Sequence, residues 1–500
     1  MFSEERYFVE YKKIRNRFRK YRYVDLFHLG LHHLHSPSKS SLQAIEKLPW
    51  VVMLLFKWML LDDQYPNSRG KTVSQAILDR LLSDIHHLST KAGLPSQYAH
   101  HVIFMRKLAN QQILYQEEMR FTCLAREKIL FSGLPEKHQI GKMFFNITGL
   151  HIPQYVELMA ALLVQMHESI DDPLIKTEWF EPLGSKYPQE ILERFFLTIS
   201  KDLDDVRQAL LALDNGRRLA NEYYEVTPFV RFPLITAEND HLITSKFILY
   251  RCAESFVYDT LREWNADKFM AKFGRIFEAY VERVLKLTHL PYRTEIQLMQ
   301  LLGPSGLQID FLVEEESANI FIDAKGVEMS RKGQTTHSPS TIRSATKTSI
   351  LKAIKQAHAV LKKMADSTGQ GLAADKHNYL LIITYKEFFL RNGATYYDAV
   401  AKSDMDQIYA KHENYPAILA ENIYFIAIDE FDILCQTIGS RKLSLAKILA
   451  TFRANDSDPH TSKFTFRQRL SNLGVDPEIP EHLDVPGLMS SLELILDSAT

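Results

Sequence analysis

The sequence predicts an α+β protein, in which a mostly helical N-terminal region precedes a part built on a central mixed sheet flanked by helices. Three observations support this prediction. Apolar residues recur at helical spacing in much of the first 230 residues, as in TVSQAILDRLLSDIHHL (72–88). Short apolar runs bounded by turn residues begin near position 231. Further on, two strand-like apolar runs, ANIFIDAK (318–325) and HNYLLIITY (377–385), are separated by a helical pattern.

Several segments of the N-terminal region are expected to be helices. LPWVVMLLFKWMLL (48–61) is too short for a membrane span and is interrupted by Lys57, so it predicts a buried helix. PQYVELMAALLVQM (153–166) begins with proline, which suits the first turn of a helix. Residues 187–213 form one long helix or two. YKKIRNRFRKYRY (11–23) mixes basic and aromatic residues, which fits either a nucleic-acid contact or a helix with its aromatic side chains packed inward.

The C-terminal part is expected to alternate strands and helices. The expected elements are β-like runs within 231–245, helices at 246–264 and 268–287, strands at 292–302, 308–315 and 318–325, a polar loop at 329–349, a helix at 350–364, and strands at 377–385 and within 422–434. We therefore divide the chain into a recognition or partner-binding region (1–230), a catalytic domain (231–440) and an extension with an acidic tail (441–500). The N-terminal region or the acidic tail would contact a protein partner.

Composition restricts the class of protein. Three cysteines lie far apart without a CxxC pair, which indicates a reducing, cytoplasmic setting. The first residues lack the apolar core of a signal peptide, and no run predicts a membrane span. No Walker A loop, GxGxxG or GxSxG motif is present, so an ATP-driven step would belong to a partner. The net charge of −1 means that attraction to a charged partner must come from local patches.

Acidic residues and one lysine occupy the expected strands in a pattern that suits metal chemistry. Asp323 and Lys325 lie two apart in a strand, so their side chains point to the same face. In isolation such a pair is most often a surface pair, but Asp310 ends the approach to the preceding strand and Glu278 borders the apolar stripe of a helix. Clustered carboxylates raise each other's pKa unless a cation lies between them. Oxygen ligands of this kind favour Mg²⁺, for which Mn²⁺ is a possible substitute.

The order of these elements and acids, over residues 265–390, resembles the PD-(D/E)xK superfamily of nucleases, which has the restriction-endonuclease-like fold. The resemblance implies that Asp310, Asp323 and Glu278 bind the divalent metal. It implies that Lys325 assists the attacking water and that Gln356 corresponds to the Gln or Lys that many members carry on the next helix. All five would be catalytic residues.

The sequence departs from the family pattern in two places. Ile309 stands where the family's proline is found, and the residue two before the lysine is aspartate rather than glutamate. On the first helix, Glu282 is the rival of Glu278 if the register shifts by one turn. Gly274 lies one turn before Glu278 on the same row of the helix, which leaves room for a close backbone approach.

Basic residues follow the third strand and precede or occupy the next helix. They are Arg331, Lys332, Arg343, Lys347, Lys352 and Lys355. Their position beside the proposed site predicts contacts with nucleic-acid phosphates. A solvated basic face is the alternative.

The function that we expect is that of a metal-dependent endonuclease that hydrolyses phosphodiester bonds of nucleic acid, DNA rather than RNA, with restriction or phage defence as the suggested setting. Three alternatives stay open. One is a non-catalytic nucleic-acid-binding or assembly subunit that keeps the fold, and another is a partner-activated effector that cuts RNA. The third is a helical interaction protein whose sheet is only structural. His28, His32, His33 and His35 include an i,i+4 pair suited to zinc, but without a nearby cysteine or an HExxH motif we expect capping or surface histidines.

Overall fold

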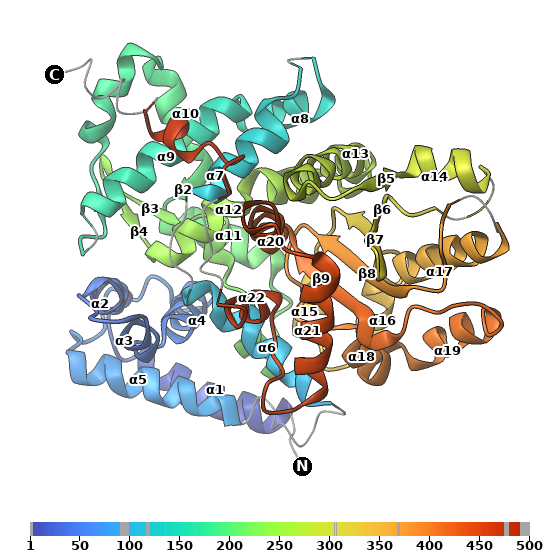
Figure 1. Ribbon diagram of the computed structural model, residues 1–500. Coiled ribbons are helices and arrows are strands. Elements are labelled where there is room, and N and C mark those ends of the chain that lie inside the picture. Colours follow the sequence, from blue (N-terminus) through green and yellow to red (C-terminus); the bar gives the residue numbers. More distant parts are fainter. Residues whose placement is uncertain are drawn as a thin grey trace. The chain divides into compact units, whose positions relative to one another are not determined.

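The chain forms two compact units in the computed structural model (Figure 1). The structure describes residues 4–90, 100–116, 121–135, 137–169, 171–304, 306, 308–367, 371–474 and 480–490, except the side chains of Ser41 and Arg331. Unit 1 comprises Met1–Gln97, Leu108–Ala266 and Asp484–Thr500, and unit 2 comprises Tyr98–Lys107 and Asp267–Leu483. The α+β class and the helical N-terminal region are confirmed. The functional division of the chain at residues 230 and 440 stays a prediction.

Unit 1 is mainly helical and contains one small sheet. Its main helices are α1 (Glu4–Phe18), α2 (Tyr23–His35), α3 (Ser41–Glu46), α4 (Pro49–Leu60), α5 (Gln75–His87), α7 (Thr122–Glu127), α8 (Gln139–Thr148), α9 (Ile152–Glu168), α10 (Gln189–Ile199), α11 (Leu203–Leu213) and α12 (Lys246–Trp264). The sheet has the order β1 (Leu174–Ile175), β4 (Asp240–Ile243), β3 (Leu234–Ala237) and β2 (Ser200–Lys201). Helix α6 (His101–Gln112) is divided between the units after Lys107.

The helices of unit 1 follow from the distribution of apolar residues. Nearly every side chain of α4 is buried, as expected for a helix that is apolar on all sides. Helix α1 buries Tyr7, Tyr11, Ile14 and Phe18, which places its aromatic side chains inward. Residues 187–213 form two helices, because strand β2 interrupts them and the Asp202 carboxylate then caps α11. Among the described residues, no single helix is long and apolar enough to cross a bilayer, whereas the bent pair α8 and α9 together meets the length and composition required.

Unit 2 is built on a five-stranded mixed sheet. The sheet has the order β5 (Tyr292–Thr294), β6 (Phe311–Glu314), β7 (Ala318–Lys325), β8 (His377–Thr384) and β9 (Ile423–Ala427). The β5–β6 and β6–β7 pairs are antiparallel, and the β7–β8 and β8–β9 pairs are parallel. Its helices are α13 (Ala266–Leu285), α14 (Glu295–Leu302), α15 (Arg331–Thr335), α16 (Pro339–Thr346), α17 (Ile350–Asp366), α18 (Gly393–Tyr396), α19 (Lys402–Lys411), α20 (Ile428–Arg441), α21 (Leu445–Ser457) and α22 (Phe466–Ser471).

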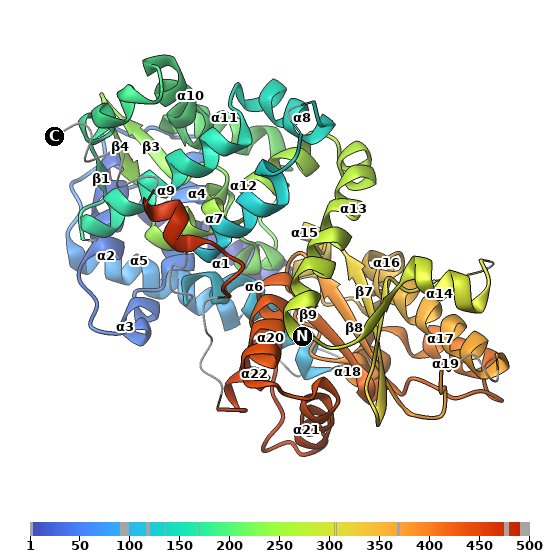
Figure 2. The same cartoon turned by 45° about the horizontal axis from the view of Figure 1, so that its top comes forward.

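Helices cover both faces of this sheet. In both views α17 lies on one side of β8 and α20 on the other (Figures 1 and 2). The core on the α17 side contains Leu312, Phe321 and Leu380 from three neighbouring strands, packed against Ile354 and Ala357 of the helix. The face of β7 that carries Phe321 also carries Asp323 and Lys325, because side chains two apart share a face. The candidate residues therefore continue the core face of the strand toward its C-terminal end.

Three predicted elements of unit 2 differ from the structure. The strand predicted at 292–302 ends after three residues, because Thr294 and Gln297 form a capping box that begins α14. The polar loop predicted at 329–349 contains α15 and α16, whose first turns are capped by Ser330 and Ser338. The strand predicted within 422–434 ends at Ala427, and α20 follows directly. In each case a local capping interaction begins a helix that apolar periodicity alone does not reveal.

Candidate active site

Strand β7 presents a buried acid and a lysine at its C-terminal end. The side chain of Asp323 is fully buried, and that of Lys325 is 15% exposed. Lys325 Nζ lies 2.5 Å from Asp323 Oδ2. Asp323 Oδ1 is also buried, and it has no hydrogen-bond partner among the described residues. A buried carboxylate oxygen without a donor is costly, so the arrangement has capacity for a further positive or donor group.

Asp310 lies beside this pair at the start of the neighbouring strand. In the antiparallel register Phe311 pairs with Ile322, so the next position outward pairs Asp310 with Asp323 and directs both side chains to one side of the sheet. Asp310 Oδ2 accepts a hydrogen bond of 2.6 Å from the Ala324 N–H. Burial raises the pKa of Asp310 to about 8, with a further contribution from the Asp323 carboxylate, whereas Lys325 opposes the shift. The two predicted metal-binding aspartates are thus close enough to perturb one another.

Helix α13 brings Glu278 to the same cluster. Burial raises the pKa of Glu278, and the carboxylates of Glu295, Glu282 and Asp323 raise it further. The rival Glu282 is occupied elsewhere, because it pairs with Lys286 at 3.0 Å and accepts a hydrogen bond from the Tyr292 hydroxyl at 3.0 Å. Glu278 is therefore the glutamate of this helix that is directed to the site.

Glu295 is an acid of this region that the sequence analysis missed. Its backbone N–H donates to the Asp310 carbonyl oxygen at 2.9 Å, which holds the first residue of α14 against the start of β6. Its carboxylate is the strongest of the charges that raise the pKa of Glu278. The apolar pattern over 292–302 predicts a continuous strand, in which Glu295 has no special position. The sequence TEIQ (294–297) carries the capping-box signal that would have placed Glu295 at a helix start.

Gln356 of α17 connects the lysine to the strand that carries Asp310. Its Oε1 accepts a hydrogen bond from Lys325 Nζ at 3.3 Å, and its Nε2 donates to the Gln308 carbonyl oxygen at 2.6 Å. The amide therefore fixes the direction of the ammonium group and the position of the segment just before Asp310. The structure brings together all five residues predicted to be catalytic.

Gly326 permits the close packing of α13 against the end of β7. A Cβ atom at Gly326 would lie 2.9 Å from Phe273 Cε1 and 3.1 Å from Phe277 Cβ. Phe277 precedes Glu278, so this packing sets how near the glutamate comes to the strand. The room that Gly274 leaves on the same helix is not used by a described neighbour, because a Cβ atom there would meet nothing within 4 Å.

Arg106 supports the segment that leaves the site after β7. It is fully buried, and its guanidinium donates to the Thr336 carbonyl oxygen and to Met329 Sδ, both at 3.0 Å. Burial lowers its pKa to about 10. Residues 98–107 lie far from the site in sequence, and no local motif marks Arg106, so sequence analysis did not find it.

The residues predicted to contact phosphate are mostly exposed. Lys332, Lys347, Lys352 and Lys355 are exposed, as is Arg343, whose guanidinium donates to Asp404 Oδ1 at 2.8 Å. Arg331 begins α15, but its side chain lies outside the described residues. Lys352 and Lys355 lie on the same helix as Gln356, so this basic surface adjoins the candidate site.

The four histidines near residue 30 are placed differently from a zinc site. His33 Nε2 lies 3.0 Å from the Lys47 carbonyl oxygen, and His35 Nε2 lies 3.0 Å from the Ile243 carbonyl oxygen. Over the residues that the structure describes, no group of three or more His, Cys, Asp or Glu side chains is arranged to hold a metal ion.

Asp310 and Asp323 nevertheless fit a divalent cation with oxygen ligands. Mg²⁺ is commonly held by one or two carboxylates, with water and substrate phosphate completing its coordination. The buried Asp323 Oδ1 accepts no hydrogen bond from the described part of the chain, and the Asp310 pKa is raised partly by the Asp323 carboxylate. A cation would satisfy the first group and offset the repulsion between the two carboxylates. Comparison of the chain with protein-family models, curated proteins and solved structures found no match.

Proposed function

We propose that the protein is a metal-dependent nuclease that hydrolyses phosphodiester bonds of nucleic acid. The observation that supports this most directly is the buried Asp323 carboxylate, which lies beside Asp310. Lys325 pairs with one of its oxygens, and no described residue donates to the other. Asp310 and Asp323 would hold Mg²⁺, and Glu278, whose charge acts on both aspartates, would add a ligand through water. The ion would neutralise phosphoryl charge and lower the pKa of a bound water.

The remaining groups have roles that their contacts suggest. Lys325 would orient the attacking water and stabilise charge on the phosphate, since Gln356 fixes its ammonium group. The exposed lysines of α17 would bind backbone phosphates on either side of the cut. DNA is the proposed substrate by analogy with most nucleases that carry such a site.

The central test is cleavage of plasmid DNA, linear DNA and total RNA with Mg²⁺ or Mn²⁺. We expect Asp323→Asn to lower the rate by on the order of 10²-fold or more, because it removes a group that stabilises the transition state. Glu278→Gln is expected to lower the rate less. Glu282→Gln is the matched control, because it lies one turn away and binds Lys286, and it should cut like the parent. Equal rates for Asp323→Asn and the parent chain would refute the proposal.

A second measurement separates metal binding from catalysis. A ligand that binds only the folded state stabilises it by about 2.7 kcal/mol at 100 times its Kd. Mg²⁺ should therefore raise the Tm of the parent chain, and Asp310→Asn or Asp323→Asn should abolish the rise. Nucleic-acid binding that persists in EDTA, with no cleavage under either metal, would instead favour a binding subunit. Cleavage confined to RNA would indicate an RNA-cutting effector.

A further inference from the structure

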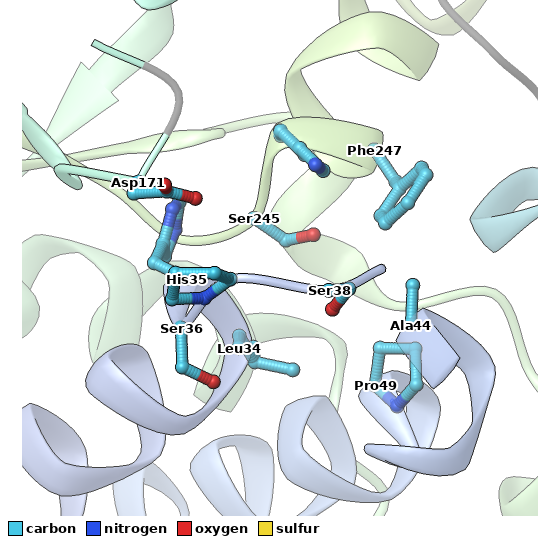
Figure 3. A pocket seen from close by; sticks show the side chains of 11 residues that line it. Leu34, His35, Ser36, Ser38, Ala44, Pro49, Asp171, Ser245 and Phe247 are labelled. Carbon is cyan, nitrogen blue, oxygen red and sulfur yellow. The ribbon is translucent and has the colours of Figure 1, made fainter. Parts of the chain in front are cut away.

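Unit 1 contains a cavity of about 220 Å³ that lies outside the candidate active site (Figure 3). It is lined by residues 34–38 at the end of α2 and just after it, by Pro49 at the start of α4, by Asp171 after α9, and by the start of α12. The lining residues used in the argument are His35, Ser38, Asp171, Ser245, Lys246 and Phe247. Its volume is below the range of drug-sized ligand sites, so an occupant would be small.

The N-terminus of α12 opens on this cavity without a cap. Ser245 occupies the N-cap position, but its side chain makes no capping hydrogen bond. Among the described residues, the N–H groups of Lys246, Phe247 and Ile248 have no acceptor. The helix has 19 residues, so its dipole adds partial positive charge at this end. Free N–H groups and a helix dipole together favour an anion.

The Ser245 hydroxyl is a second, independent sign of a ligand. Ser245 is only 3% exposed, and its side chain makes no hydrogen bond to any described residue. Figure 3 shows its oxygen among the lining side chains, between Phe247 and Ser38. The oxygen is not among the fully buried polar atoms, so it is accessible from the cavity, where a ligand would supply its hydrogen-bond partner.

The charges around the cavity also suit an anion. Lys246 lines the cavity. Lys47 is close to it: burial is the main cause that lowers the Lys47 pKa, and the charge of Lys246 is the second. Asp171 is the one carboxylate among the lining residues, and it is exposed. Burial lowers the His35 pKa to about 4, so His35 adds no charge at neutral pH. The Lys246 ammonium and the N-terminus of α12 thus lie at the cavity together with one lining carboxylate. Lys47 is nearby, and its ammonium donates to the Leu34 and Ser36 carbonyl oxygens.

We propose that this cavity binds the phosphate group of a small ligand. The phosphate would accept hydrogen bonds from the first-turn N–H groups of α12 and from Ser245, and it would pair with Lys246. Phe247 lies on the wall, with the Lys246 ammonium 5.5 Å from its ring centre, and it offers an apolar surface to a short organic group attached to the phosphate.

The test is a titration of the full chain with inorganic phosphate at constant ionic strength, followed by Tm and by calorimetry. We expect saturable binding with a rise in Tm. Lys246→Met should weaken binding by about tenfold or more, the scale of a charge-assisted hydrogen bond to an anion. Ser245→Ala should weaken it by about fivefold. It should leave the Tm without phosphate nearly unchanged, since the hydroxyl does not cap α12 and bonds to no described residue.

Controls distinguish a specific site from surface screening. Lys142→Met changes an exposed lysine of α8 in the same unit and should bind phosphate like the parent. Lys246→Arg keeps the charge and should retain binding. If Lys246→Met does not fold, Ser245→Ala carries the test. A non-saturating response shared by all variants would overturn the proposal, as would acetate binding as tightly as phosphate.

Discussion

Asp323 differs from a structural aspartate in the way its two oxygens are used. A buried carboxylate is usually stabilised on both oxygens by hydrogen bonds or ion pairs, because a lost partner costs about 1–3 kcal/mol. Here Lys325 pairs with one oxygen while the other has no donor among the described residues. A buried oxygen without a donor is tolerated when a bound group supplies the missing interaction. We therefore propose that the metal binds at this oxygen.

His358 gives a second prediction at the residue scale, on pH-dependent stability. This residue of α17 is 1% exposed, with Nδ1 2.9 Å from the Ile354 carbonyl oxygen and Nε2 3.4 Å from the Ile418 nitrogen. Only the neutral ring can donate at Nδ1 while accepting the Ile418 N–H at Nε2. Burial lowers its pKa to about 4, and the His412 ring, 5.8 Å away between centres, lowers it further.

The folded-state pKa of His358 is below the unfolded value of about 6.5, so the unfolded chain takes up the proton first as the pH falls. The stability from the neutral ring is complete above pH ~6.5 and is lost between there and pH ~4, by about 3 kcal/mol. The free energy of unfolding of His358→Gln, measured with urea, should therefore fall less between pH ~6.5 and pH ~4 than that of the parent chain, by about 3 kcal/mol. His377→Gln, an exposed residue at the start of β8, should keep the parent profile. Parallel profiles for His358→Gln and the parent would contradict the prediction.

At the scale of elements, the contact between α13 and the end of β7 determines the position of Glu278. Gly326→Ala would place a methyl group against Phe273 and Phe277, and the helix must shift to accept it. Overpacking of this kind costs about 1–3 kcal/mol. We expect a lower free energy of unfolding and slower cleavage, measured by urea denaturation and by the plasmid assay.

Gly274→Ala is the matched control for this contact, because it lies on the same helix with open space at its Cβ position. It should raise the free energy of unfolding by about 0.5–1 kcal/mol through helix propensity and leave cleavage unchanged. If Gly326→Ala is as stable and as active as the parent chain, the packing does not position Glu278.

The candidate site was predictable where its signals are local. Asp323 and Lys325 share a face because they lie two apart in a strand, and the apolar run around them reveals the strand. Asp310 could be included because an antiparallel neighbour was expected. The contact of Gly326 with Phe273 and the support from Arg106 could not be predicted, since they depend on how distant segments pack. Helices α14 and α20 were missed because apolar strand-like runs concealed their caps.

At the scale of the whole molecule, attraction to a polyanion depends on how charge is distributed. The chain has 60 basic and 61 acidic residues, so its net charge gives no general attraction to nucleic acid. Binding must then depend on a local surface, for which the exposed lysines of α17 are the candidates. Each phosphate contact contributes about −0.9 to the slope of log K against log salt.

Replacing Lys352 and Lys355 by glutamine should therefore weaken DNA binding and make that slope shallower by up to about 2. Fluorescence anisotropy over a series of KCl concentrations measures both quantities, in EDTA so that the DNA stays intact. The double change of Lys442 and Lys447 to glutamine, at exposed positions at the end of α20 and on α21, is the control with the same change in net charge. Equal slopes for the two double variants would show that the surface of α17 does not contact DNA.

The short borders of the five-stranded sheet have a consequence for how the protein behaves at high concentration. A long free strand edge is a template on which another chain can add its own backbone, and aggregation often begins there. On one border β5 spans three residues before the chain turns into a helix, and on the other Asn392 forms a bridge with Tyr424 of β9. Each border therefore offers a foreign strand only a short stretch of regular backbone, which lowers the tendency of this apolar sheet to add a strand from another chain.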